Sequence, residues 1–391
     1  MRRLLAVLLI VSTAACGASA QFVGAAGVKR EIPRDPPVEE TVRGVTAFGH
    51  ALLSAVAKPG ENVVLSPLSI ASAYGMARAG AVGATAAELD QVFGFPAKEG
   101  PHAAFNALTE QVERSKQVSV ANALFPQQGS PINQDFLRTL AAQYGTGVQT
   151  VDFTAGNAVD VINDWADRNT AGRIKKVFEQ LDPRTKLVLA NAVHLKADWL
   201  LPFGKEPTQN ATFTRHDGST LQTPTMHAMD RFAYAAGKGW QAVELPYQGG
   251  QLAMWVLVPS PGGSPGDLLK PETLEQVARG LKGASVDLKL PKWDFATTID
   301  LMPPMEQLGL RDSDFSGIAP GLFISQAIHR ANITVDERGT EAAAVTALAF
   351  EASGPGAMDA TVRADHPFAF AIVHKPTRTP LFVGQVADPG L

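Results

Sequence analysis

The order of helical and strand patterns along the chain restricts its fold more than any other feature of the sequence. Apolar residues recur at helical spacing in residues 42–56 and again in residues 157–170, whereas strand patterns dominate after residue 185. Residues 186–196 form a continuous apolar run, which is typical of a strand in the middle of a large sheet. Helices and strands do not alternate regularly, so the sequence predicts an α+β fold and not a doubly wound α/β fold.

Local signals predict where several elements begin and end. A short strand is expected at residues 62–65, and Ser66 and Pro67 are typical of the N-cap and first turn of a following helix. Thr85 and Glu88 have the spacing of a capping box, so another helix is expected to begin there. Further strands are expected at residues 251–258, 285–290 and 380–386.

Residues 1–20 are typical of a signal peptide. A basic start precedes the apolar run 4–11, which is too short to span a bilayer, and residues 18–20 have the A-x-A pattern of a cleavage site. Cys16 is the only cysteine, and with residues 13–15 it resembles a bacterial lipobox in which Thr replaces the usual Leu. We therefore predict an exported protein, extracellular or periplasmic, and leave open whether a lipoprotein signal ends before Cys16 or the chain is freely secreted.

The rest of the chain is predicted to form one domain behind a short tether. Residues 21–40 contain three prolines and few apolar side chains, which is typical of a linker. No break in composition divides residues 41–391. A single cysteine cannot form an internal disulfide, so the domain is expected to depend on its apolar core.

Composition and motifs argue against several classes of function. The net charge is −4 and no Lys/Arg run occurs, so neither a nucleic acid nor a heparin-type partner is expected. The eight histidines lack metal-ligand spacing and no phosphate loop is present, so no metal or cofactor is expected. Residues 262–266 fit the G-x-S-x-G pattern of serine hydrolases with Ser264 at its centre, but the surrounding prolines and glycines are typical of a loop. A serine hydrolase is the least favoured function, and we predict that the chain is not an enzyme.

One alanine-rich segment suggests another use. In residues 340–352 the even-numbered side chains carry no charge, whereas Glu341 and Glu351 fall on odd positions. Alternate side chains of a strand face opposite sides of a sheet, so this segment can enter a sheet with its uncharged face buried. An alanine-rich surface helix is the alternative.

Several separated motifs resemble those of the serpin family, and the resemblance covers roughly residues 41–391. They lie, in order, at residues 62–70, 162–174, 191–199, 244–247, 290–293, 336–346, 364–368 and 381–386. The resemblance implies a fold of three sheets and about nine helices, with an exposed reactive loop at about residues 337–362.

The resemblance also implies a mechanism, for which serpin loop insertion is the established example. A serine protease cleaves the loop and is held in a covalent complex, while the freed loop enters the main sheet as a new strand. The inserting positions carry no charge or proline, which favours a suicide inhibitor. The inhibitor is expected to be a monomer. A non-inhibitory serpin that acts as a binding module is the alternative.

Position within the motifs implies three groups of site residues. The hinge of the loop comprises Glu337, Gly339, Thr340, Glu341, Ala342, Ala343, Ala344, Val345 and Thr346. A hydrogen-bonded shutter beneath the sheet comprises Ser66, Ser69, Asn191 and His329. A breach at the top of the sheet comprises Trp199, Lys292 and Glu337, with an ion pair expected between the last two.

The cleaved bond is predicted only within a short range. Counting from the hinge glycine places it between Ser353 and Gly354, whereas counting back from Pro367 places it about three residues later. The other candidates are Ala352, Gly356, Ala357 and Met358. Small residues dominate this range and no Lys or Arg lies between residues 339 and 359, which favours an elastase-like or subtilisin-like target.

Overall fold

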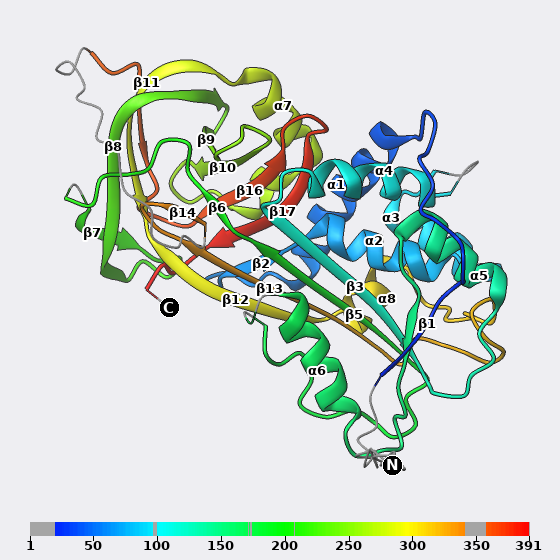
Figure 1. Ribbon diagram of the computed structural model, residues 1–391. Coiled ribbons are helices and arrows are strands. Elements are labelled where there is room, and N and C mark those ends of the chain that lie inside the picture. The colour runs from blue at the N-terminus through cyan, green and yellow to red at the C-terminus, as the bar shows by residue number, and fades with distance from the viewer. Residues whose placement is uncertain are drawn as a thin grey trace, which may run out of the picture.

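A six-stranded sheet runs through the middle of the protein in this computed structural model, which describes residues 20–96, 100–170, 172, 174–206, 208–340 and 357–390 (Figure 1). Its strands follow the order β3-β5-β13-β14-β6, and β12 also pairs with β13. They are β3 (Val118–Pro126), β5 (Leu187–Leu195), β6 (Ala197–Asp198), β12 (Trp293–Asp300), β13 (Gln326–Val335) and β14 (Gly339–Thr340). Every residue of β5 except His194 is buried, as expected for the apolar run at residues 186–196.

A second sheet of nine strands packs beside the first, and a two-stranded sheet joins β1 to β4. The strands of the second sheet are β2 (Val63–Leu65), β7 (Gln209–Thr214), β8 (Thr220–Gly237), β9 (Trp240–Pro246), β10 (Leu252–Pro259), β11 (Lys282–Pro291), β15 (Ala360–Arg363), β16 (Phe368–His374) and β17 (Thr379–Val386). The strands of the small sheet are β1 (Gln21–Val23) and β4 (Val148–Thr150). Strands β10, β16 and β17 are buried along their whole length, which explains their nearly continuous apolar sequences.

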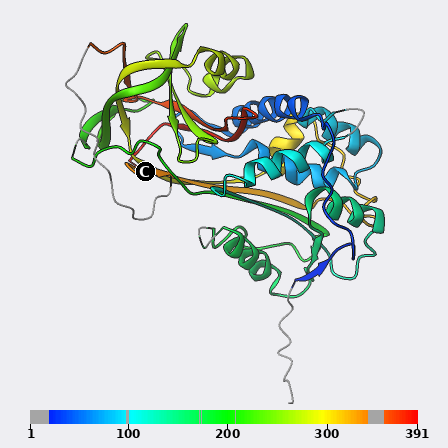
Figure 2. The same cartoon turned by 45° about the horizontal axis from the view of Figure 1, so that its top comes forward.

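Helices cover both faces of the six-stranded sheet (Figure 2). Helix α6 lies on one face, whereas α1, α2 and α4 lie on the other. The described residues contain eight α-helices, close to the expected nine: α1 (Val38–Val56), α2 (Pro67–Arg78), α3 (Gly83–Phe93), α4 (His102–Glu113), α5 (Gln134–Thr139), α6 (Ala158–Asn169), α7 (Pro271–Gly280) and α8 (Met302–Leu308). Short turns of other helix types are η1 (Leu140–Tyr144) and η2 (Gly266–Leu269). The predicted α+β class is confirmed.

The two predicted helix starts have different outcomes. Ser66 is the N-cap of α2, and its hydroxyl accepts a hydrogen bond from the Ser69 N–H. The capping box at Thr85 is wrong, because α3 already begins at Gly83. Thr85 Oγ1 instead accepts the Asp314 N–H at 2.7 Å, and Glu88 accepts two backbone N–H groups of the same distant loop. These side chains join two parts of the chain and do not close a helix end.

The segment predicted to be a tether is attached to the domain in several places. Residues 21–23 form β1, which pairs with β4, and Glu31 N–H donates to the Ala142 carbonyl at 2.7 Å. The folded part therefore includes residues well before Thr41.

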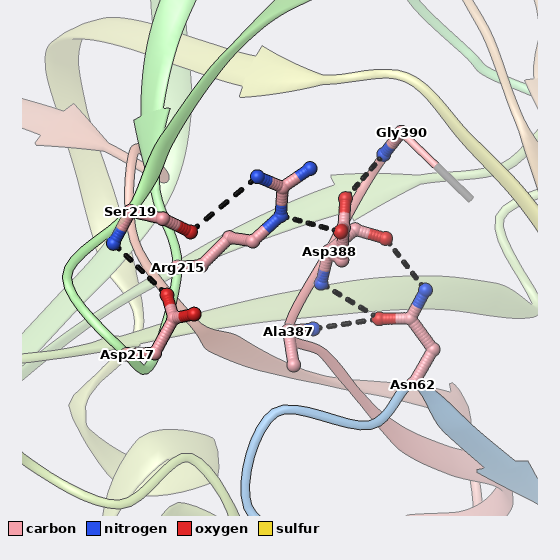
Figure 3. Close-up of polar contacts among 7 residues, drawn as sticks. All are labelled: Asn62, Arg215, Asp217, Ser219, Ala387, Asp388 and Gly390. Atoms are coloured by element: carbon pink, nitrogen blue, oxygen red, sulfur yellow. Dashed lines mark hydrogen bonds and ion pairs between the residues drawn. The ribbon is translucent and has the colours of Figure 1, made fainter.

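A polar cluster holds the C-terminal segment after β17 (Figure 3). Asn62 Oδ1 accepts the N–H groups of Ala387 and Asp388 at 2.7 and 2.9 Å, and its amide donates to the Asp388 carbonyl. The buried Asp388 carboxylate pairs with Arg215 Nε and also accepts the Gly390 N–H. The edge of the nine-stranded sheet beside β2 is therefore fastened by side chains far apart in sequence.

Candidate functional site: the strand junction and its hinge

Strands β5 and β13 are direct parallel neighbours in the middle of the six-stranded sheet. Their pairing extends from Gln326 opposite Val188 to Ala331 opposite Val193. No strand lies between them over this range. The sheet is therefore closed here, and admitting one more strand would widen it by about 4.8 Å.

The two-residue strand β14 already lies between β6 and the C-terminal end of β13. After β13 the chain turns at residues 336–338, and β14 pairs with Val335 on one side and with Ala197 and Asp198 on the other. Asp336 shapes the turn, because its Oδ1 accepts the N–H groups of Arg338 and Gly339 at 2.8 and 3.3 Å. The start of the predicted reactive loop is thus already part of the sheet.

Close approach to β6 explains the glycine in the hinge. A Cβ atom added to Gly339 would lie 2.2 Å from the Ala197 carbonyl oxygen, which belongs to the backbone and cannot move aside cheaply. Any larger residue would push the backbone of β14 away from β6.

Thr340 is buried at the point where β14 ends. Its side chain shares a 2.6 Å hydrogen bond with the hydroxyl of the fully buried Tyr247. Burial raises the pKa of the Tyr247 hydroxyl. Trp199 stacks on Tyr247 with ring centroids 4.5 Å apart and donates its indole N–H to the Asp336 carbonyl at 3.0 Å. Our sequence reasoning gave Tyr247 no role, although it lies in one of the motifs, because a lone tyrosine after a strand carries no sign of its distant partner.

The expected ion pair at the breach is present. Lys292 Nζ lies 2.9 Å from Glu337 Oε2, with the glutamate side chain 11% exposed. Burial acts to raise the pKa of Glu337, but hydrogen bonds from Lys292 and from the backbone outweigh it, so the pKa lies below its ordinary value. The Glu337 carbonyl accepts the Phe203 N–H at 2.8 Å, so both side chain and backbone of this residue are held.

The four predicted shutter residues contact one another across the closed junction. Asn191 of β5 and His329 of β13 face each other in register, and His329 Nδ1 hydrogen bonds to Asn191 Oδ1. The Asn191 amide donates to Ser69 Oγ and to Asn122 of β3. The Ser66 N–H donates to His329 Nε2 at 3.2 Å.

These contacts define the protonation state of His329. Since Nε2 accepts a backbone N–H, the ring proton is on Nδ1 and is donated to Asn191. The ring is completely buried, and desolvation lowers its pKa from 6.5 to about 3. The side chain is therefore neutral, and every polar atom of the ring has a partner.

Several predicted site residues lie outside the described residues. These are Cys16, Glu341, Ala342, Ala343, Ala344, Val345, Thr346, Ala352, Ser353, Gly354 and Gly356. Ala357 is exposed and, with Met358, leads without regular structure toward β15. The position of the cleaved bond stays a prediction.

The surroundings of Ser264 do not resemble a hydrolase site. Ser264 lies in a surface depression of about 760 Å³ that His366 also lines. His366 contacts acceptor oxygens with both ring nitrogens, Asp365 Oδ1 at 2.8 Å and the Pro259 carbonyl at 2.9 Å. It is therefore not placed to take a proton from Ser264.

The fold, the closed junction and the turned-in hinge together define a serpin. A family model described as Serpin (serine protease inhibitor) matches residues 43–389, so the chain belongs to this family. The family is one of protease inhibitors and not of hydrolases, in agreement with our prediction that the chain is not an enzyme.

Similar proteins come from distant organisms. Neuroserpin of Homo sapiens is 33% identical over 356 residues, which cover 84% of this chain and 86% of neuroserpin. Leukocyte elastase inhibitor A of Rattus norvegicus is 33% identical over 359 residues, covering 85% and 94% of the two chains. The crystal structure of tengpin, a thermophilic serpin, in the native state has a TM-score of 0.84 at 24% identity, covering 95% of this chain and 100% of that one, and shows a shared fold. These comparisons support the serpin family. They do not support the bacterial-type, exported subclass that we expected, because a human protein is among the relatives.

Proposed function

We propose that this protein is an exported suicide inhibitor of serine proteases. One observation carries the proposal: β14 is seated as the first two residues of a strand, while β5 and β13 remain paired beyond it. This is the arrangement expected of a loop that has begun to enter a sheet and is ready to continue. Once a protease cuts the loop, the remaining hinge residues would extend β14 between β5 and β13.

The two contact groups would have opposite tasks in this mechanism. The shutter keeps β5 and β13 together through the His329–Asn191 hydrogen bond until the loop is cut. The breach holds the first residues of the loop in register through the Lys292–Glu337 ion pair, and Tyr247 holds Thr340 of the hinge beside it. The uncharged face of residues 340–352 then enters the sheet without burying a charge.

The target proposed is an elastase-like or subtilisin-like protease. The candidate cleavage positions are small residues or Met358, and the segment contains no Lys or Arg. Similarity to a leukocyte elastase inhibitor supports this choice. The complex would be covalent and the inhibitor monomeric.

The predicted signal peptide supports export, and the bacterial-type assignment rests on the lipobox-like sequence before Cys16. Metabolic labelling with a radioactive fatty acid, compared between the parent and Cys16→Ser, would separate a lipid-anchored protein from a freely secreted one. Label in the parent alone would support the anchor, and label in neither would support free secretion.

Incubation with a pancreatic elastase and a subtilisin tests the main proposal. We expect an adduct that survives SDS electrophoresis, and mass spectrometry should show a cut between residues 350 and 359. Cleavage without an adduct and without a gain in heat stability would favour the non-inhibitory binding module instead.

A further inference from the structure

The N-terminal arm, which we define as residues 20–37, crosses the side of the molecule from β4 to α1 (Figure 1, dark blue). Its first part is strand β1, in which Gln21, Phe22 and Val23 pair antiparallel with Thr150, Gln149 and Val148. A Cβ atom at Gly147, the residue before β4, would lie 2.2 Å from the Val23 carbonyl oxygen, so the glycine leaves room for the arm. The Val23 side chain packs against the main core.

The second part of the arm is bonded to α4. Arg30 Nε donates to Asn106 Oδ1 at 2.7 Å and a terminal guanidinium nitrogen donates to the Asn106 carbonyl at 3.0 Å. The Asn106 amide donates in return to the Glu31 carbonyl at 3.0 Å. Asn106 is buried, with only 1% of the residue exposed. Its shortest side-chain hydrogen bonds are those to Arg30 and Glu31 of the arm.

The arm also contacts η1. Glu31 N–H donates to the Ala142 carbonyl at 2.7 Å, and the Gln143 side chain donates to the Glu31 carboxylate at 2.7 Å. Past these contacts the chain continues directly into α1. The arm is therefore joined to β4 at one end and to α1 and α4 at the other.

These attachments lie on the two sides of the movement that loop insertion requires. Separating β5 from β13 displaces β3, because β3 pairs with β5 along its whole length. Strand β4 moves with β3, since Val151 N–H donates to the Pro126 carbonyl and Gln128 N–H to that of Val151. Helix α1, into which the arm continues, packs instead against β17 and α8, which are not among these strands.

We propose that the N-terminal arm is a strap that restrains opening of the six-stranded sheet and so slows entry of a strand before a protease has cut the loop. The proposal rests on the proposed function, since it assigns a brake to the same movement. It differs from the shutter in place, because the strap acts at the edge of the sheet and the shutter at the junction itself.

Uptake of a synthetic peptide tests the strap. The peptide has the sequence of residues 340–352, and uptake means that it enters the six-stranded sheet as an added strand. The protein used is the mature chain beginning at Gln21. Uptake is measured as the increase with time of the fraction of protein that resists heat denaturation. We expect Arg30→Ala, and a chain beginning at residue 33, to take up peptide roughly tenfold faster or more, because both variants lose the two charged hydrogen bonds that Arg30 donates to Asn106 in the closed state.

Two further variants make the test specific. Arg43→Ala removes an arginine that is paired with Glu39 at 3.9 Å on the exposed face of α1, and it should leave the rate unchanged. Phe22 and Gln149 face each other across β1 and β4, so replacing both by cysteine allows a disulfide that fixes the arm. The oxidised double variant should take up peptide more slowly than the parent, and dithiothreitol should restore the rate.

The outcomes separate the two proposals. Uptake by Arg30→Ala and by the shortened chain at the parent rate would overturn the strap and leave the inhibitor proposal intact. Equal acceleration by Arg43→Ala would also overturn the strap, because it would indicate general loosening. A parent chain that takes up no peptide and gains no heat stability on loop cleavage would overturn the inhibitor proposal and the strap with it.

Discussion

Acidification should weaken the closed junction through one side chain, His329. The folded protein holds this ring neutral with a pKa of about 3, whereas in the unfolded chain it titrates near 6.5. A folded pKa below the unfolded one means that the unfolded state binds more protons between these values. Stability is therefore highest above pH 6.5 and falls as the pH drops toward 3.

The expected size follows from the difference in proton binding. Each pH unit below 6.5 costs about 1.36 kcal/mol until the folded ring itself is protonated. At pH 5 the contribution of His329 is thus a loss of about 2 kcal/mol relative to pH 7. Protonation would also put a proton on Nε2, where the Ser66 N–H now donates.

The measurement is the free energy of the first urea-induced unfolding transition at pH 7 and pH 5. Burial also lowers the pKa of His50, His102 and His374, so the parent alone does not isolate the effect. His329→Gln keeps a donor and an acceptor but has no proton to gain, and we expect its loss between the two pH values to be smaller by about 2 kcal/mol. Equal pH dependence in the parent and in His329→Gln would refute the reasoning.

Three further predictions concern single substitutions. Glu337→Lys places a second cation beside Lys292 at a mostly buried position, and it should lower stability by about 2–3 kcal/mol and promote polymers on native gels; a monomeric variant with unchanged heat stability would contradict this. Thr340→Arg puts a charge at the first buried loop position, so the variant should be cleaved by the target protease without forming an SDS-stable adduct, and an unchanged yield of adduct would contradict the role of the hinge. Asp388→Ala removes the carboxylate of the C-terminal cluster and should lower the free energy of unfolding by about 1–2 kcal/mol, whereas a value within 0.5 kcal/mol of the parent in urea titrations would indicate that Asn62 alone holds the segment.

Short sequence patterns predicted helix starts correctly where the hydrogen-bond partner of the capping side chain is also close in sequence. Ser66 caps α2 because its hydroxyl and the Ser69 N–H are three residues apart, and no distant group is needed. Thr85 and Glu88 have an equally good capping pattern, yet they bind a loop more than two hundred residues away. Sequence alone offers no way to weigh a distant backbone N–H against a neighbouring one.

The same limit applies to residues 21–40. Prolines and a low apolar content do predict a linker when the segment is considered alone. The arm is held instead by groups on β4, α4 and η1, and a buried asparagine on a separate helix is its main partner. Such partners become visible only when the folded chain brings them together.

By itself the sequence determined the α+β class, the buried central strand at residues 186–196 and the uncharged face of the hinge segment, because these depend on the periodicity of apolar side chains. It also pointed to the shutter and breach residues through their motifs. Only the tertiary structure decided that β5 and β13 are closed, that β14 is already seated with Thr340 on Tyr247, and that the arm is bonded to the domain. The physical reason is that these features are contacts between distant segments, whose geometry depends on how the layers pack and not on any local pattern.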